Sequence, residues 1–184
     1  MSITITRTLD GDLAETAWKL YYDAFAPLNA LAVQRHLMTR AEFAEVAADT
    51  RVDKVLTYDA DGELVGLATF TNHLDAVPLV SPAYFERRWP ELYAQHRIWY
   101  IGFVAVAEPA RKTGAFVEAF YHYYETADAA DGIVCLDVCS HNEATYRLPQ
   151  TIAAQVRRLS DRRSASERAD AQSFWIYDMR GRHL

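Results

Sequence analysis

The sequence has only two cysteines and no surplus of positive charge, and both shortages exclude classes of protein. Cys135 and Cys139 are too few for a disulfide scaffold, and their spacing is not that of a zinc site. The chain has 19 lysines and arginines against 25 acidic residues, a formal net charge of -6 at pH 7. Because a nucleic-acid-binding surface needs basic residues to neutralise phosphates, this balance argues against nucleic acid as a partner.

Long apolar runs are also missing. No stretch approaches the roughly 20 apolar residues that cross a bilayer, and residues 1–9 lack the apolar segment of a secretory signal. We therefore expect no membrane partner and a cytoplasmic location. The composition is otherwise ordinary for a globular protein, with 51% hydrophobic and 24% charged residues in 184. A chain of this length is most often one domain, so we expect a single domain over residues 1–184.

The first half of the chain carries strong local signals for its elements. In residues 3–7 threonines alternate with Ile3, Ile5 and Arg7, and most of these side chains are β-branched, which predicts an opening strand. A helical pattern follows, and the capping box that begins at Thr39 predicts a second, shorter helix. Residues 52–58 and 64–71 read as the two strands of a hairpin, with Asp61-Gly62 in the turn.

The centre of the chain is a junction between a strand and a helix. An apolar run over 99–106 predicts a buried strand, a loop with Arg111, Lys112 and Gly114 follows, and a helical pattern begins at Ala115. The first amides of a helix have no intrahelical partners, and the helix dipole favours negative charge there. Such a junction can hold an anion, most often a phosphate.

This junction resembles the cofactor loop of the GNAT acetyltransferase superfamily. In that family a strand ending in Val is followed by Pro, then by Arg or Gln, two residues, Gly, one residue, and Gly or Ala. Val106 is followed at the family's spacing by Arg111 and Gly114. The sequence departs from the pattern at two places: Pro109 comes one residue late, and Phe116 stands where the family has Gly or Ala.

The second half of the chain carries a further resemblance. Residues 133–138 predict a strand in which Asp137 stands out among apolar neighbours, although a strand-end carboxylate bonded to a backbone N–H is the commoner explanation. The helix that opens after it resembles the family's next helix, with matches at Asn142 and Ala144, followed by Tyr146 one turn later.

The end of the chain predicts three further segments. Pro149 is costly inside a helix, so we expect it to start a separate helical segment over residues 150–159. Residues 160–171 predict a charged, solvated loop. Residues 174–179 predict a final aromatic strand beside the fifth.

The order of elements implies the GNAT fold class, an α/β (α+β) architecture. We expect a mixed central sheet, flanked by helices, in which the fourth and fifth strands splay apart. Residues 76–97 depart from the family as an insert between the third and fourth strands, rich in aromatics and cations. Long connections in compact domains are usually functional or disordered, and the aromatic content argues against disorder. We expect a partly helical segment, either a lid over the acceptor side of the site or a buttress that completes the core or forms a dimer contact.

The resemblance implies an N-acyltransferase, with acetyl-CoA or another acyl-CoA as co-substrate, an amine of a small molecule or peptide as acceptor, and no metal. Direct attack of the amine on the thioester is implied. In the family's arrangement the cofactor contacts fall on the fourth strand, on the loop and the start of the helix that follows it, and on the helix after the fifth strand. These residues are Phe103, Val104, Val106, Arg111, Lys112, Thr113, Gly114, Ala115 and Asn142. Tyr146 is the candidate acid for the departing thiolate. His73 is a candidate base, with His141 and water as alternatives.

Other interpretations remain open. Phe116 would keep CoA phosphates at a distance, so the donor could instead be an acyl-carrier protein, which is acidic and would suit the cations Arg87, Arg88, Arg97 and Lys112. A non-catalytic GNAT-like binding or regulatory module also fits the altered loop. A cysteine hydrolase built on Cys139 has no orienting carboxylate or oxyanion hole that the sequence identifies. The hydrophobic insert and the aromatic final strand are compatible with a homodimer.

Overall fold

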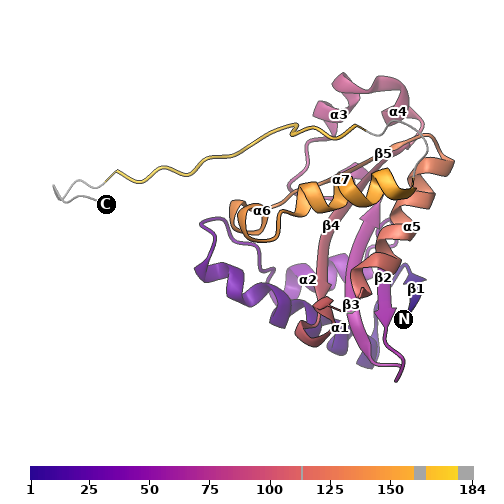
Figure 1. The fold of residues 1–184 in the computed structure, drawn as a ribbon, viewed down its shortest axis with the longest axis vertical. Coiled ribbons are helices and arrows are strands. Elements are labelled where there is room, and N and C mark those ends of the chain that lie inside the picture. Colours follow the sequence, from indigo (N-terminus) through magenta and orange to yellow (C-terminus); the bar gives the residue numbers. More distant parts are fainter. Residues whose placement is uncertain (113, 160–164, 178–184) are drawn as a thin grey trace. The chain divides into compact units, whose positions relative to one another are not determined.

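Five strands form one mixed sheet in the order β1-β2-β3-β4-β5 (Figure 1). The strands are β1 Ser2–Thr6, β2 Asp53–Tyr58, β3 Leu64–Thr71, β4 Ile98–Val106 and β5 Ile133–Leu136. The first four pair antiparallel in sequence order, and β4 and β5 run parallel. The mixed α/β architecture predicted from the sequence is confirmed.

The structure, a computed structural model, describes residues 1–112, 114–159 and 165–177. Its contacts divide the chain into two compact units, Met1–Cys139 and Ser140–Leu184. The first unit contains the sheet, and the described residues of the second include helices α6 (Ser140–Tyr146) and α7 (Leu148–Leu159). Within the part of the chain that is described, no helix has both the length and the apolar character needed to cross a membrane.

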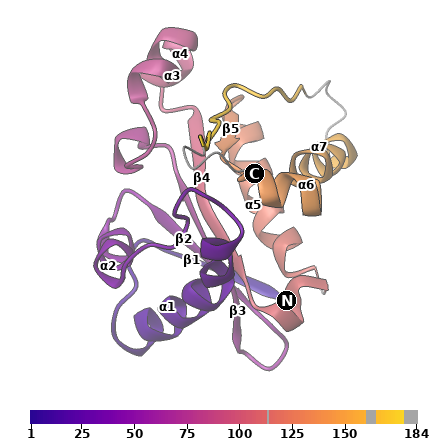
Figure 2. The same cartoon turned by 90° about the vertical axis from the view of Figure 1, so that its left-hand side faces the viewer.

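In the first unit, helices cover both faces of the sheet (Figure 2). Helices α1 (Gly11–Phe25) and α2 (Arg40–Ala48) lie on one face, and α5 (Ala115–Ala129) lies on the other. The core between α1, α2 and the sheet includes Tyr21 and Phe103, and the core under α5 includes Phe70 and Tyr123. The sheet is therefore buried on both sides.

Local chemistry explains the elements at the start of this unit. Thr39 caps α2 as predicted: its hydroxyl accepts from the Glu42 N–H, and the Glu42 carboxylate accepts from the Thr39 N–H at 2.6 Å. The predicted hairpin between β2 and β3 is also confirmed. Gly62 takes the left-handed φ of 82° in its turn, and the Asp59 carboxylate accepts from the N–H groups of Asp61 and Glu63.

The insert is partly helical, as expected, with helices α3 (Pro82–Arg88) and α4 (Pro90–Ala94), and a short 3₁₀ helix η2 (Leu74–Ala76) leads into it. Its aromatic side chains pack with Leu74, Ile98 and Tyr100 in a third core cluster. Of the interpretations of residues 76–97, this packing favours the buttress that completes the core.

The second unit begins with α6 (Ser140–Tyr146), and α7 (Leu148–Leu159) follows it. Arg147 between them has a left-handed φ of 50°, and Pro149 is the second residue of α7, where a proline N–H is not needed. The predicted helix break is confirmed, and α7 starts two residues earlier than predicted.

The predicted final strand is wrong over the residues that the structure describes. Phe174 to Tyr177 have no secondary structure, and Trp175 and Tyr177 are both 78% exposed; residues 178 and 179 lie outside the described residues. Aromatic β-propensity reflects packing on a pleated surface rather than an intrinsic backbone preference. A strand also needs a neighbour for its backbone groups, and this segment has none among the described strands.

Candidate functional site

The pairing of β4 with β5 ends well before β4 does. The parallel register runs from Ile98 opposite Ile133 to Ile101 opposite Leu136, where β5 ends. β4 then continues to Val106 with β3 as its neighbour on the other side. The C-terminal half of β4 therefore carries backbone groups that β5 does not use.

The direction of those backbone groups follows from the antiparallel pairing with β3. The Ala107 N–H donates to the Val65 carbonyl at 2.9 Å, and hydrogen-bonding directions alternate along a strand. Ala105 and Ala107 thus face β3, while Val104 and Val106 turn their N–H and C=O toward the side where β5 has ended. These are two of the three β4 residues that the sequence predicts as cofactor contacts.

The third predicted contact, Phe103, lies in a β-bulge. Between Ala68 and Phe70 of β3 the register gains one extra residue on β4. The Phe103 N–H donates to the Thr69 hydroxyl at 3.2 Å, and the Phe103 ring is buried against Tyr21 with ring centroids 4.8 Å apart. The bulge therefore commits the amide and the side chain of Phe103 to the fold, and Phe103 faces β3 rather than the side where β5 has ended.

The loop after β4 forms a short 3₁₀ helix η3 (Glu108–Lys112) and leads into α5. The exposed Arg111 side chain folds back, so that its Nε donates to the Val106 carbonyl at 3.3 Å. Gly114 is the N-cap of α5 with a left-handed φ of 84°. Arg111 thus contacts the end of β4, and Gly114 begins a helix whose N-terminus favours an anion.

Several predicted loop contacts fall on parts that the structure does not describe. Thr113 lies outside the described residues. The same holds for the side chains of Lys112, Ala115 and Phe116, although the backbone of these three residues is described.

Asn142 and Tyr146 belong to the second unit, on α6. Asn142 is half-buried in the first turn of the helix and is not its N-cap residue, since the helix begins at Ser140. Tyr146 is the last residue of the helix and its side chain is 55% exposed.

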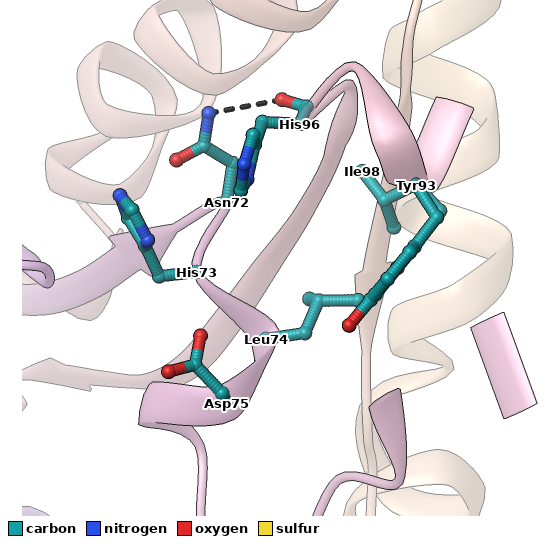
Figure 3. A pocket seen from close by; sticks show the side chains of 7 residues that line it. All are labelled: Asn72, His73, Leu74, Asp75, Tyr93, His96 and Ile98. Atoms are coloured by element: carbon teal, nitrogen blue, oxygen red, sulfur yellow. Dashed lines mark hydrogen bonds between the residues drawn. The ribbon is translucent and has the colours of Figure 1, made fainter. Parts of the chain in front are cut away.

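His73 lies at the other end of β4 from the loop. Thr71 is opposite Tyr100, so His73 is level with Ile98, five residues from Phe103, or roughly 16 Å along the strand. It lines a small hollow of about 30 Å³ with His96, whose ring centroid is 5.4 Å away, and in Figure 3 the Asn72 amide donates to the His96 carbonyl.

Over residues 1–112, 114–159 and 165–177, no group of three or more His, Cys, Asp or Glu side chains is arranged to hold a metal ion.

The structure adds one pair of residues that the sequence does not bring together. The Tyr100 hydroxyl donates to the Asp137 carboxylate at 2.7 Å, just where β4 and β5 part. Burial and the nearby carboxylate raise the pKa of Tyr100, and burial raises the pKa of the neighbouring Cys135 thiol to about 11. Asp137 stands out in the sequence, but its partner lies 37 residues away and no local pattern identifies it.

No family model matches the sequence, and no curated protein matches it. Solved structures do match the fold. A GNAT-family acetyltransferase from Listeria monocytogenes 4b F2365 superposes with a TM-score of 0.54 and 12% identity, covering 82% of this chain and 84% of that one. A ribosomal-protein-alanine N-acetyltransferase from Brucella melitensis biovar Abortus 2308 gives 0.50 and 16%, covering 96% and 99%.

A transcriptional regulator from Bacillus halodurans C-125 is equally similar, with a TM-score of 0.55, 16% identity and coverage of 94% and 100%. Identities at this level show a shared fold and carry no activity over to this chain.

Proposed function

We propose that this chain, which has the fold of the GNAT acetyltransferases, transfers an acyl group from acyl-CoA to the amine of a small molecule or peptide. Acetyl-CoA is the simplest donor. The observation that carries the proposal is the half of β4 that extends beyond β5, where Val104 and the Val106 N–H turn away from β3 and a glycine-capped helix follows.

In this proposal the amides of the acyl-CoA arm pair with the N–H and C=O of Val104 and with the N–H of Val106. A strand edge offers both donors and acceptors, as such an arm requires. The pyrophosphate lies over the N-terminus of α5, against backbone N–H groups from Lys112 to Ala115, Thr113 and Gly114 included, with the charge of Arg111 beside it.

The chemistry needs an oxyanion donor and an acid. A backbone N–H of Val104 or Val106 can donate to the thioester oxygen as negative charge develops there. We assign the acid that protonates the departing thiolate to Tyr146, and a contact with the CoA arm to Asn142. His73 receives no proton-transfer role, because it is level with Ile98 at the far end of β4.

The first test is a calorimetric titration of the full chain with acetyl-CoA. Arg111→Ala removes a cation beside the proposed pyrophosphate, so we expect the Kd for acetyl-CoA to rise about three- to tenfold. Arg87→Ala is the matched control, since it removes an exposed arginine from α3 in the insert, and its Kd should equal that of the wild type. Equal Kd values for all three proteins would contradict binding of the pyrophosphate at this loop.

The second test measures turnover. Release of free thiol from acetyl-CoA, and from longer acyl-CoAs, is followed with n-butylamine, spermidine and short peptides that carry a free α-amino group. We expect amine-dependent thiol release. Tight binding of acetyl-CoA without thiol release would instead support a non-catalytic binding or regulatory module. The similarity to a structure described as a transcriptional regulator is the observation that favours this alternative.

A further inference from the structure

We propose that Asp137, held in place by Tyr100, binds the ammonium group of the acceptor. The inference rests on the proposed function and adds to it the residue that receives the acceptor and the charge that the acceptor carries. Tyr100 acts through Asp137 and is a positioning residue.

The pair combines a buried donor with an exposed acceptor. Tyr100 is 9% exposed and packs in the core cluster of the insert with Ile98 and Cys135. Asp137 is exposed, and its Oδ1 accepts the Tyr100 hydroxyl proton at 2.7 Å. A carboxylate has about four lone-pair sites, and one phenol occupies one of them. The remaining sites face solvent and suit an ammonium group, which has only donors.

The proton in the Tyr100–Asp137 hydrogen bond lies on Tyr100. Burial, together with the Asp137 charge, raises the pKa of Tyr100 far above the range in which enzymes work. The phenol is therefore a permanent donor and cannot itself remove a proton from a substrate. Its hydrogen bond fixes the orientation of the Asp137 carboxylate at the point where the strand ends and a side chain would otherwise be free to turn.

The position of Asp137 along the sheet matches the proposed thioester site. Leu136 is opposite Ile101, so Asp137 is level with Gly102 and next to the bulge that precedes Val104. His73, by comparison, is level with Ile98. In the proposed function the acyl group lies against β4 just beyond this level, at Val104 and Val106.

The two faces of the sheet separate donor and acceptor. Trp99 and Ile101 pack under α5, the helix whose N-terminus would hold the pyrophosphate. Tyr100 points to the opposite face, where it packs with Cys135 beside the insert. A thioester that passes between β4 and β5 from the side of α5 would thus meet an amine held by Asp137 on the other face.

The reaction balances with this assignment. Asp137 binds the ammonium form, which loses one proton to solvent at the exposed carboxylate. The amine nitrogen then attacks the thioester carbon, the C–N bond forms, and the C–S bond breaks with its electron pair on sulfur. The nitrogen releases its second proton and the thiolate takes one up, so the products are an amide, a free thiol and one net proton.

The test compares steady-state kinetics of Asp137→Asn and Tyr100→Phe with wild type, using acetyl-CoA and the same three kinds of amine. Both changes keep the size of the side chain. For Asp137→Asn we expect the KM for the amine to rise at least about tenfold, while the Kd for acetyl-CoA stays within about twofold. For Tyr100→Phe we expect a smaller rise of about two- to fivefold. The double variant should match Asp137→Asn, because Tyr100 acts only through Asp137.

Asp61→Asn, in the exposed turn between β2 and β3, removes the same charge from the same unit and should leave both constants unchanged. An amine KM in Asp137→Asn within twofold of wild type would overturn the inference and leave the proposed function standing. The inference would also be overturned if the Kd for acetyl-CoA rose as much as the KM for the amine, because such a joint effect indicates a structural role. If the wild type neither binds acetyl-CoA nor acylates any of the amines, the proposed function fails first, and the assignment of Asp137 falls with it.

Discussion

Lys54 is a residue whose charge lies almost entirely inside the protein. Its side chain is 1% exposed, and its Nζ donates to the carbonyls of Arg7 at 2.8 Å and Asp49 at 2.7 Å. The two bonds tie the end of β1 to the end of α2, across β2. Burial is the main cause that lowers the pKa of Lys54 to about 8, against an opposing effect of the Asp49 and Asp53 carboxylates.

This lowered pKa predicts a pH-dependent stability. In the unfolded chain Lys54 binds its proton up to a pH of about 10.4, while in the folded protein it releases the proton near pH 8. Between these values the unfolded state binds more protons, so the contribution of Lys54 to the free energy of unfolding rises with pH. It is fully present above about 10.4 and is lost as the pH falls through 8.

Lys54→Met keeps the length of the side chain and removes the titrating group. Urea denaturation of both proteins at pH 7, 8, 9 and 10 should show the wild type gaining stability relative to Lys54→Met across this range. The comparison cancels other groups that titrate there, such as Cys135, whose raised pKa of about 11 acts in the opposite direction. Parallel curves for the two proteins would contradict a lowered pKa for Lys54.

At the scale of an element, the bulge in β4 depends on one hydroxyl of the neighbouring strand. Thr69 is buried, and its Oγ1 accepts the Phe103 N–H at 3.2 Å. Gly102 is required beside it, because a Cβ at that position would lie 2.7 Å from the Thr69 Oγ1. The bulge sets the positions of Phe103, buried on the side of α1, and Val104, which packs on the side of α5.

We expect Thr69→Val to lower the free energy of unfolding by about 1–2 kcal/mol, because it leaves the buried Phe103 N–H without its acceptor. Val has the shape of Thr, so the loss reports the hydrogen bond and not a cavity. Thr69→Ser keeps the hydroxyl and is the control; it should retain the register of β4 and, in the proposed function, the acetyl-CoA affinity. Chemical denaturation measures the first effect and calorimetry the second. A Thr69→Val protein as stable as the wild type would mean that the bulge does not depend on this bond.

Sequence reasoning succeeds for elements whose signals lie within a few residues. The Thr39–Glu42 capping box, the Gly62 turn and the helix break at Pro149 each use chemistry that neighbours in the chain provide. It fails where a distant partner decides: the aromatic residues of 174–177 have strand propensity, but no described strand pairs with them.

The candidate site likewise contains residues that local spacing identifies and residues that depend on a distant partner. Arg111 and Gly114 follow from local spacing, and the structure has Arg111 against the Val106 carbonyl and Gly114 as the N-cap of α5. The bulge at Phe103 needs Thr69, 34 residues away, and the Asp137 carboxylate needs Tyr100, 37 residues away. Neither partner can be identified without the register of the sheet.

At the scale of the whole molecule, net charge bears on the choice of acyl donor. The chain carries a formal charge of -6 at pH 7, which opposes the approach of an acidic carrier protein. Two of the cations that would suit such a carrier are already engaged. Arg97 is bonded to Asp131 and Gln95, and the Arg88 guanidinium lies over the Trp89 ring at 4.7 Å. A small donor such as acyl-CoA needs only the local cations of the loop and avoids most of this repulsion.

We therefore expect acetyl-CoA to be the better donor by at least about tenfold in kcat/KM over an acetylated carrier protein, at an ionic strength near 0.02 M. Raising the salt to about 0.3 M should bring the kcat/KM values of the two donors closer together. Screening strongly weakens the long-range repulsion between two acidic proteins, and it has less effect on the close contact of Arg111 with a phosphate. Thiol release with each donor, at both salt concentrations and with the same amine, measures the ratio. The carrier-protein interpretation predicts the reverse: a carrier that is preferred at low salt and loses its advantage as salt is added. The sign of the salt effect on this ratio thus decides between a surface that repels an acidic carrier and one that recruits it.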